Sequence, residues 1–207
     1  MKSNKTILHL CADIGSDSQP YRDNGYNVIC IGKNVGVENY HPPENVYGVI
    51  ANPPCTMFSI ARTCAKTPRD LEEGMKLVKE CLRIIWECQY KTPLNKRVGI
   101  LKFWVIENPA TGMLKYFLGK PNYQYCPSEF GAGHTKRTAL WGFFNHPKKP
   151  FMQFSLLEKC NSLAGGKNAH TSLLKYKGTS QQKREEQMHD RSKCYPEFAK
   201  AFYLENQ

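Results

Sequence analysis

The sequence predicts an α/β protein whose open, mostly parallel sheet carries helices on both faces. Two observations lead to this prediction: short β-compatible runs alternate with helical patterns, and the runs end in polar loops. The length of 207 residues suits one hydrophobic core with at most a small appendage. Ligands of open α/β sheets bind at the carboxyl ends of the strands, so we expect a site among these polar loops.

The first three strands are expected at Lys5–Cys11, Tyr26–Ile31 and Gly48–Ala51, because these runs are apolar and rich in β-compatible residues. A short helix at Gln19–Asn24 separates the first two strands and indicates a β-α-β unit. The third strand runs into an Asn-Pro-Pro-Cys sequence, in which two prolines stop regular structure and stiffen the backbone. Cys55 is therefore expected just beyond the carboxyl end of a strand.

The clearest helix is expected from Thr67 to Tyr90. Thr67 is predicted to cap it, with Pro68 in the first helical position and Asp70 as the acidic residue of a capping box. Apolar residues recur every three or four positions, as on one buried face: Leu71, Met75, Val78, Leu82 and Ile85. The three tryptophans of the chain fall on apolar faces and are expected in the core: Trp86, Trp104 and Trp141.

A fourth strand, Phe103–Glu107, runs into the polar loop Asn108–Gly112, and two further strands are expected at Tyr123–Cys126 and Thr138–Phe144. An apolar helical pattern at Tyr195–Tyr203 is expected to dock on the core. These patterns complete the alternation of strands and helices.

We divide the chain into an α/β core (residues 1–144), a small basic C-terminal lobe (145–191) and a closing helix (192–207). Basic and aromatic side chains alternate in the lobe, which suits phosphate contacts and base stacking. They are Lys148, Lys149, Lys159, Lys167, Lys175, Lys177, Lys183, Arg184 and Arg191, with Phe151, Phe154 and Tyr176. A solvated surface loop is the alternative interpretation of this segment.

The composition favours an acidic partner, because 29 Lys and Arg against 18 Asp and Glu leave a formal charge of +11. No apolar run approaches the roughly 18 residues that span a bilayer, and the amino terminus lacks the apolar region of a signal peptide. We therefore expect a cytoplasmic protein without a membrane partner. The nine cysteines include no C-x-x-C pair, which argues against a disulfide framework and against a metal site.

Cys55 and Glu107 are the strongest candidates for chemistry. A cysteine held by prolines at the ligand edge, near a carboxylate from a neighbouring strand, suits a covalent nucleophile and its acid partner. The alternative is a Pro-Pro turn with a buried cysteine and a glutamate that caps a strand. His9, on the first strand, is interpreted as a satisfied core or rim histidine.

Five segments match, in the same order, the motifs of one enzyme family. Pro53–Arg62 (PPCTMFSIAR) is similar to its P-C-Q-x-F-S-x-A motif, and Trp104–Pro109 (WVIENP) is similar to its E-N-V element. Leu8–Ser16 lies where the family carries D-L-F-x-G-x-G-G, and His134–Trp141 resembles its basic Q-x-R-x-R strand. Ser192–Phe202 resembles the G-N-S-V-P helix that closes the cofactor pocket. The family is that of the DNA cytosine-C5 methyltransferases, and the whole chain resembles its short, phage-type branch.

The resemblance implies a Rossmann-like class I methyltransferase fold and methyl transfer from S-adenosylmethionine to cytosine C5. By resemblance, the Cys55 thiolate attacks cytosine C6, Glu107 holds or protonates N3, and Arg137 favours the thiolate or holds the flipped base. The implied partner is DNA, either a duplex with a flipped cytosine or a single strand, and the enzyme is a monomer or a dimer. The implied purpose is modification that protects phage DNA from restriction.

The remaining site residues are carried over from the matching motifs. Those implied to bind the cofactor are Leu10, Cys11, Asp13, Gly15, Asn52 and Pro53. Those implied to bind the substrate are Pro54, Ser59, Asn108, Pro109 and Lys136.

Two positions depart from the family pattern at the cofactor. Asp13 stands where the family has a glycine, which lets the backbone approach the cofactor closely. The second strand ends on Ile31–Lys33, without the acidic residue expected to hold the ribose hydroxyls. Two other interpretations stay open: a cytosine-modifying enzyme with another donor, and a catalytically lapsed nucleic-acid-binding or inhibitor protein on the same fold.

Overall fold

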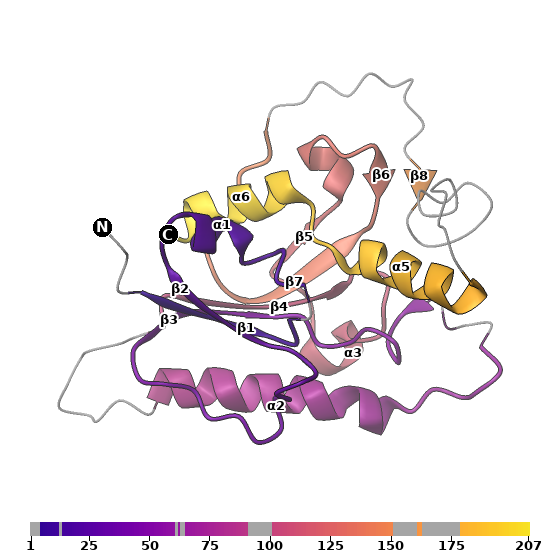
Figure 1. Cartoon of the computed structure of the whole chain (residues 1–207), viewed down its shortest axis with the longest axis horizontal. Helices are drawn as coiled ribbons and strands as arrows, with labels where there is room; N and C mark the ends of the chain where they lie inside the picture. The colour runs from indigo at the N-terminus through magenta and orange to yellow at the C-terminus, as the bar shows by residue number, and fades with distance from the viewer. Residues whose placement is uncertain are drawn as a thin grey trace.

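A six-stranded sheet forms the centre of the molecule, with strand order β2-β1-β3-β4-β7-β5 (Figure 1). The computed structural model describes residues 5–12, 14–60, 62, 65–90, 101–150, 161–162 and 179–207. The strands of the large sheet are β1 Thr6–Leu10, β2 Asn27–Ile31, β3 Val46–Ala51, β4 Phe103–Pro109, β5 Tyr123–Tyr125 and β7 Thr138–Phe143. A separate parallel pair consists of β6 His134–Thr135 and β8 Asn161–Ser162.

The sheet is mostly parallel. β2, β1, β3 and β4 run in the same direction, whereas β7 is antiparallel to both of its neighbours, β4 and β5. The carboxyl ends of β1, β3 and β4 therefore share one edge with the start of β7. The chain passes from β1 to β2 on one side and then returns to β3 on the other side of β1, so the strand order reverses between β1 and β3. In open α/β sheets such a switch point is where ligands bind.

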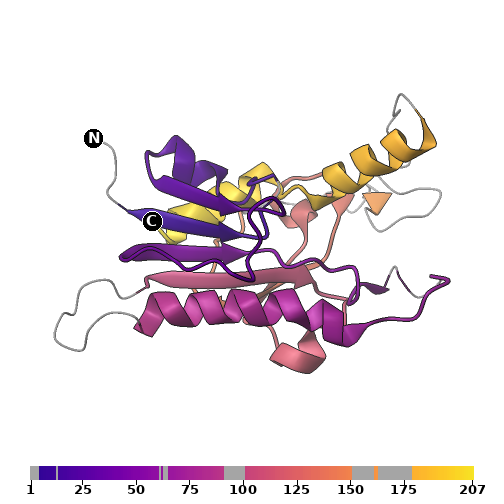
Figure 2. The same cartoon turned by 60° about the horizontal axis from the view of Figure 1, so that its bottom comes forward.

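Helices cover both faces of the sheet, as predicted. Helices α1 (Gln19–Asp23) and α6 (Pro196–Glu205) lie on one face, and α2 (Leu71–Tyr90) lies on the other (Figure 2). Helix α5 (Ser180–Ser192) lies beyond the carboxyl ends of the strands, toward the right of Figure 1. Two short helical elements complete the described structure: α3 Lys115–Leu118 and the 3₁₀ helix η2 Pro127–Phe130.

The two faces of the sheet bury separate apolar cores because side chains alternate along each strand. Leu8 and Leu10 of β1 pack in the core beneath α2, whereas Ile7 packs in the core beneath α1 and α6. The α2 side is mainly aliphatic, with Met75, Val78, Cys81, Ile84, Ile85 and Cys88 as the buried helix residues. The other side is aromatic, and includes Tyr21, Phe103, Phe198, Phe202 and Tyr203.

Helix α2 starts later than predicted. It begins at Leu71, and the carboxylate of Asp70 accepts a hydrogen bond from the backbone N–H of Glu73 at 2.9 Å. Asp70 thus satisfies an N-terminal amide, which is the function of a cap. The prediction that Thr67 caps the helix is wrong, because its hydroxyl accepts a hydrogen bond from Arg62 at 2.7 Å instead.

One of the three tryptophans is not in the core. Trp141 is buried and Trp104 packs against the core, but the Trp86 side chain is 63% exposed and its ring lies 4.1 Å from that of Tyr90. The periodic pattern of α2 places Trp86 next to the buried Ile85 in sequence, and consecutive helical residues point about 100° apart. Ile84 and Ile85 are the adjacent pair that faces the sheet, and Trp86, a further 100° round the helix from Ile85, lies outside the buried stripe.

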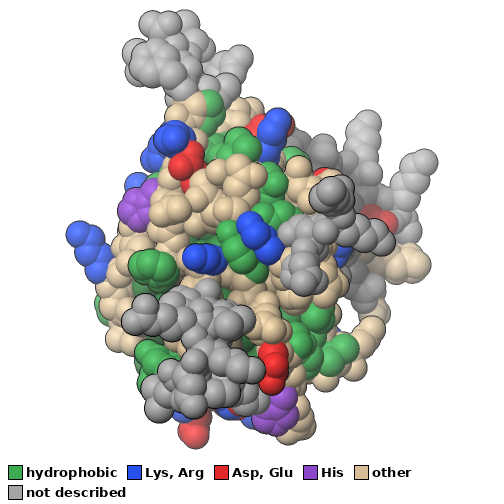
Figure 3. All heavy atoms as spheres, turned by 90° about the vertical axis from the view of Figure 1, so that its left-hand side faces the viewer, with side chains coloured by type: hydrophobic (Ala, Val, Ile, Leu, Met, Phe, Trp, Pro, Cys, Tyr) green, Lys and Arg blue, Asp and Glu red, His purple; other side chains and the backbone are tan. Residues whose placement is uncertain are grey.

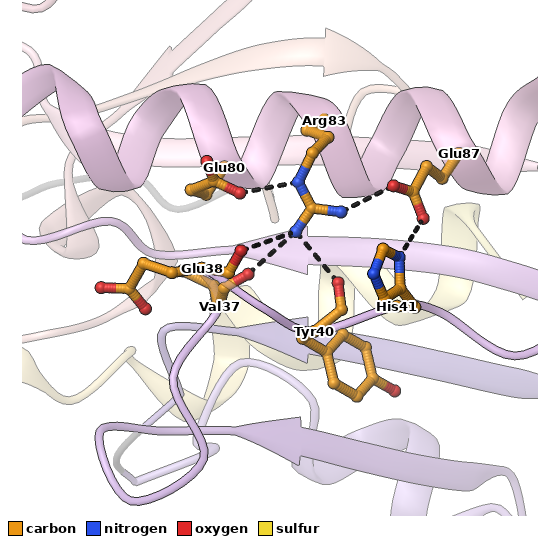
Figure 4. Close-up of polar contacts among 7 residues, drawn as sticks. All are labelled: Val37, Glu38, Tyr40, His41, Glu80, Arg83 and Glu87. Carbon is orange, nitrogen blue, oxygen red and sulfur yellow. Dashed lines mark hydrogen bonds and ion pairs between the residues drawn. The ribbon is translucent and has the colours of Figure 1, made fainter.

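Arg83 ties α2 to the loop after β2 (Figure 4). Its guanidinium donates hydrogen bonds to the carboxylates of Glu80 at 2.7 Å and Glu87 at 2.6 Å. It also donates to the carbonyl oxygens of Val37 and Tyr40, both at 3.0 Å. The hydrogen bond to Glu80 is the largest effect that raises the Arg83 pKa, and this outweighs burial. This contact fixes the position of the loop that leads from β2 back to β3.

The face at the amino ends of the strands carries both charged and hydrophobic side chains. Figure 3 shows described Lys and Arg side chains interspersed there with acidic and hydrophobic ones. The basic lobe expected at 145–191 lies largely outside the described residues, apart from 145–150, 161–162 and the stretch that leads into and forms α5. Within the described part of the chain, no helix is long and apolar enough to cross a membrane.

Candidate active site at the carboxyl ends of the strands

Cys55 lies in a turn directly after β3 and is half-buried. Its carbonyl oxygen accepts backbone hydrogen bonds from Phe58 at 3.0 Å and from Ser59 at 2.7 Å. The guanidinium of Arg69 donates to the carbonyl oxygens of Met57 and Ser59, both at 2.9 Å. The backbone around the thiol is therefore held in one conformation.

The segment before Cys55 is joined to both neighbouring strands. The backbone N–H of Asn52 donates to Leu10 on β1 at 3.0 Å, and the side-chain amide of Asn108 on β4 donates to the Pro53 carbonyl at 3.0 Å. The Oδ1 atom of Asn108 is buried and accepts no hydrogen bond from the described residues. A buried acceptor of this kind is costly unless a donor reaches it, so it is open to an N–H group of a ligand or to water.

Glu107 lies near the carboxyl end of β4, half-buried. Burial raises the pKa of its carboxyl group, and the nearby carboxylate of Asp17 adds to this rise. The ammonium group of Lys136 and a hydrogen bond from Asn52 act in the opposite direction, but the net pKa is above the usual range. The protonated form of Glu107 is thus favoured more than that of an exposed glutamate, as a proton donor requires.

Lys136 is the cation of this site. Burial lowers the pKa of its ammonium group, but the surrounding acidic groups raise it by more. In order of decreasing effect these groups are Glu107, Cys194, Asp17 and Cys55. Lys136 therefore stays charged and stabilises the ionised form of each acid around it, including a Cys55 thiolate.

The side chain of Arg137 does not face the site as that of Lys136 does. Its side chain is exposed, and its carbonyl oxygen accepts a hydrogen bond from the backbone of Ala110 at 3.0 Å. Successive residues of an extended chain point to opposite sides, so only one of Lys136 and Arg137 faces the site. The structure brings Lys136 to Cys55 and Glu107, and it leaves the Arg137 side chain in solvent.

A polar network lies at the switch point between β1 and β3. The ring of buried His9 lies 2.8 Å from Ser18 Oγ through Nδ1 and 2.8 Å from Asn52 Oδ1 through Nε2. The amide nitrogen of Asn52 lies 3.5 Å from the Asp17 carboxylate, which is itself 4.0 Å from His9 Nε2. His9 is a satisfied buried histidine, as the sequence indicated, and it fixes the direction of the Asn52 amide.

The segment before α6 closes over the loop that follows β1. The backbone N–H of Cys194 donates to Ser16 Oγ at 2.9 Å, and its thiol is hydrogen-bonded to Asp17. Burial raises the pKa of this thiol well above its usual range, and the Asp17 carboxylate raises it further. Tyr125 of β5 belongs to the same buried group, and burial together with Cys194, Glu107 and Asp17 raises its pKa.

Of the residues expected to bind the cofactor, Leu10, Cys11 and Gly15 lie at the end of β1 and in the loop after it, whereas Asn52 and Pro53 follow β3. Leu10 is buried at the end of β1, and Cys11 follows it with a left-handed backbone, φ 55°. Gly15 also has a positive φ of 72°, and a Cβ there would lie 3.3 Å from the sulfur of Cys30. The prediction for Asp13 lies outside the described residues.

The residues expected to bind the substrate surround Cys55. Pro54 is exposed, Ser59 and Pro109 are half-buried, and Asn108 is buried. Of this set, Lys136 belongs with Cys55 and Glu107 at the centre of the site.

Sequence reasoning missed three residues of this site: Asp17, Ser18 and Cys194. Asp17 and Ser18 lie in the polar loop after β1, where their residue types were a usable signal. Cys194 lies within the segment that resembles a closing helix, but nothing in the sequence joins it to Asp17. Among the described residues, no group of three His, Cys, Asp or Glu side chains is arranged to hold a metal ion.

No protein-family model matches the chain, and no curated protein matches it at a significant level. The residues of the site are therefore the basis on which a function can be proposed.

Proposed function

We propose that the protein is a DNA cytosine-C5 methyltransferase with a Rossmann-like class I methyltransferase fold. The observation that carries this proposal is the convergence of Cys55, Glu107 and Lys136 at one sheet edge. They supply a thiol, a carboxyl group with a raised pKa and a half-buried ammonium group. Covalent attack on a pyrimidine needs a nucleophile, a proton donor and a positive charge that stabilises the thiolate.

In the proposed mechanism, the ammonium of Lys136 holds Cys55 as a thiolate. Its sulfur forms a bond with C6 of cytosine while N3 takes the proton of Glu107, which leaves C5 as the nucleophilic carbon of an enamine. S-adenosylmethionine, when bound, supplies the methyl group that C5 takes up. A base, ordinarily water, then removes the C5 proton, the C6–S bond breaks so that Cys55 leaves as a thiolate, and N3 returns its proton to Glu107.

The cofactor would lie at the switch point between β1 and β3. Leu10, Cys11, Gly15, Asn52 and Pro53 are the residues that would hold it. The chemistry of the site fits a cofactor with ammonium and sulfonium groups, because the Asp17 carboxylate lies beside Asn52 at this point.

DNA would approach from the carboxyl edge of the sheet. Arg137 is exposed beside the site, and this suits a phosphate contact that positions the backbone without reading sequence. Cytosine inside a duplex would have to leave the base stack to reach Cys55, whereas a single strand needs no such step. The buried acceptor of Asn108 would then be available to an amino group of the base or the cofactor.

The test is transfer of a labelled methyl group from S-adenosylmethionine to single-stranded and duplex DNA. We expect label on cytosine C5 with the wild-type protein and none with Cys55→Ser. Cys88→Ala is the matched control, because Cys88 is a buried cysteine of α2 and is not among the groups that act on Glu107 and Lys136. If the wild-type protein transfers no label but binds DNA equally well after Cys55→Ala, it is a binding protein on this fold.

Calorimetric titration tests the cofactor separately. A dissociation constant for S-adenosylmethionine weaker than about 1 mM, roughly 4 kcal/mol of binding, would contradict methylation by this protein. In that case, a C5-modified cytosine formed with another donor would indicate a different cytosine-modifying enzyme.

A further inference from the structure

Cys11 and Cys81 approach each other closely although they lie 70 residues apart in the sequence. Their sulfur atoms are 3.8 Å apart, and they come from different elements, the end of β1 and the middle of α2. We propose that these two cysteines form a disulfide when the protein meets a peroxide, and that this bond ties the loop after β1 to α2. The inference is independent of the proposed function.

The two thiols differ in access, which assigns their roles. Cys11 is half-buried at the start of a loop, whereas Cys81 is fully buried among the apolar residues beneath the sheet. An oxidant from solvent therefore meets the Cys11 sulfur first, and Cys81 is the thiol that resolves the oxidised product. The hydrogen bond with Cys11 raises the pKa of the Cys81 thiol, and burial raises it further, so Cys81 is a poor first target.

The reaction balances with the peroxide as the two-electron oxidant. The Cys11 thiol and one peroxide molecule give a sulfenic acid and water. The Cys81 sulfur then attacks the Cys11 sulfur, a second water leaves, and the S–S bond forms. In total, two thiols and one hydrogen peroxide give one disulfide and two waters, and dithiothreitol reverses the change.

Closure requires the sulfur atoms to move from 3.8 Å to a bond length of about 2.05 Å. Cys81 lies in the interior of a 20-residue helix, so the loop is the side that adjusts. Cys11 already has φ 55°, a conformation that costs energy for a residue other than glycine.

The experiment treats the reduced full-length protein with a small excess of hydrogen peroxide and maps its peptides without reduction. We expect a peptide pair joined through Cys11 and Cys81, a loss of two alkylatable thiols in the denatured protein, and recovery of both after dithiothreitol. Cys11→Ser and Cys81→Ala must each abolish the joined pair. Cys88→Ala removes a different buried cysteine of α2 and must leave the pair intact.

Folding of each variant is checked by its thermal transition, since loss of the pair in an unfolded variant says nothing about geometry. The wild-type protein provides the decisive result in any case. If Cys11 oxidises to the sulfinic acid while Cys81 remains alkylatable, or if the two peptides never join, the proposal is wrong.

Discussion

The Nε2 atom of His9 lies 2.8 Å from Oδ1 of Asn52, across the switch point between β1 and β3. Because an amide oxygen only accepts hydrogen bonds, the ring proton lies on Nε2 and the Asn52 nitrogen faces the carboxylates of Asp17 and Glu107. A histidine in the first strand thus orients an amide that directly follows the third. This contact connects the core of the sheet to the chemistry proposed at its edge.

Replacement of His9 by leucine is expected to lower the free energy of unfolding by about 1–3 kcal/mol, because buried polar atoms of Ser18 and Asn52 lose their partner. His9→Gln is expected to lose less, since its amide can still donate to Asn52. Urea unfolding of the three proteins measures the difference. Equal stability of the leucine variant and the wild type would show that the network contributes nothing.

Lys136→Gln and Arg137→Gln are expected to separate chemistry from DNA affinity, on the basis of the proposed function. Loss of the Lys136 ammonium removes the charge beside Cys55 and Glu107, so kcat is expected to fall about 100-fold or more at saturating DNA. Loss of the exposed Arg137 charge is expected to raise KM and to reduce the salt dependence of binding by about one phosphate contact.

Steady-state kinetics at several salt concentrations test this pair. The opposite pattern, in which Arg137→Gln lowers kcat and Lys136→Gln changes only affinity, would contradict the assignment of Lys136 to the site.

Cys194→Ala is expected to change the pH dependence of stability. Burial raises the folded-state pKa of this thiol above its ordinary value of 9.0, so the unfolded chain releases the proton first as pH rises. The contribution of the protonated thiol to the free energy of unfolding is complete below pH 9.0 and is lost as pH rises above it. The free energy of unfolding then falls by up to about 1.4 kcal/mol per pH unit. In the Cys194→Ala protein, this fall in the free energy of unfolding above pH 9.0 is absent.

Thermal or urea unfolding from pH 7 to pH 11 measures this effect. At neutral pH the same variant differs from the wild type only by a constant packing cost, which serves as the internal control. Parallel curves for the two proteins above pH 9.0 would contradict the raised pKa.

Asp70→Ala is expected to destabilise the protein by about 1 kcal/mol, because the backbone N–H of Glu73 loses its acceptor at the start of α2. Thr67→Ala is the matched control and is expected to cost less than about 0.5 kcal/mol, since Thr67 lies outside the helix on an exposed turn. Urea unfolding compares the two variants, and an equal or larger loss for Thr67→Ala would place the cap where the sequence pattern first indicated it.

Much of the fold could be predicted from the sequence because its elements are strongly periodic. The strands up to β4 and the buried stripe of α2 follow from runs of apolar residues and from the positions of Pro and Gly. The start of α2 could not be predicted in this way, because Thr67 and Asp70 are both good capping residues. Only the path of the backbone decides which of them caps the helix. The exposure of Trp86 likewise depends on which side of α2 meets the sheet.

The sequence predicts the candidate site only where the end of one strand fixes the position of one residue. Cys55 and Glu107 follow from this rule, because Cys55 lies just beyond the end of β3 and Glu107 lies near the end of β4, and the two strands are parallel. The choice between Lys136 and Arg137 depends on the register of β7 against β4, in which Thr138 pairs with Pro109. The contact of Asp17 with Cys194 depends on the whole chain path and has no local signal.

The hydrogen bond between Ser16 and Cys194 spans 178 residues of sequence. A ribosome that has not yet translated Cys194 therefore carries a nascent chain in which the polar loop after β1 is still uncovered. Contacts of such high sequence separation also form late in refolding, since loop-closure entropy opposes them. Closure of this edge over the loop after β1 is consequently a late step for the growing protein, after the strands of the sheet have paired.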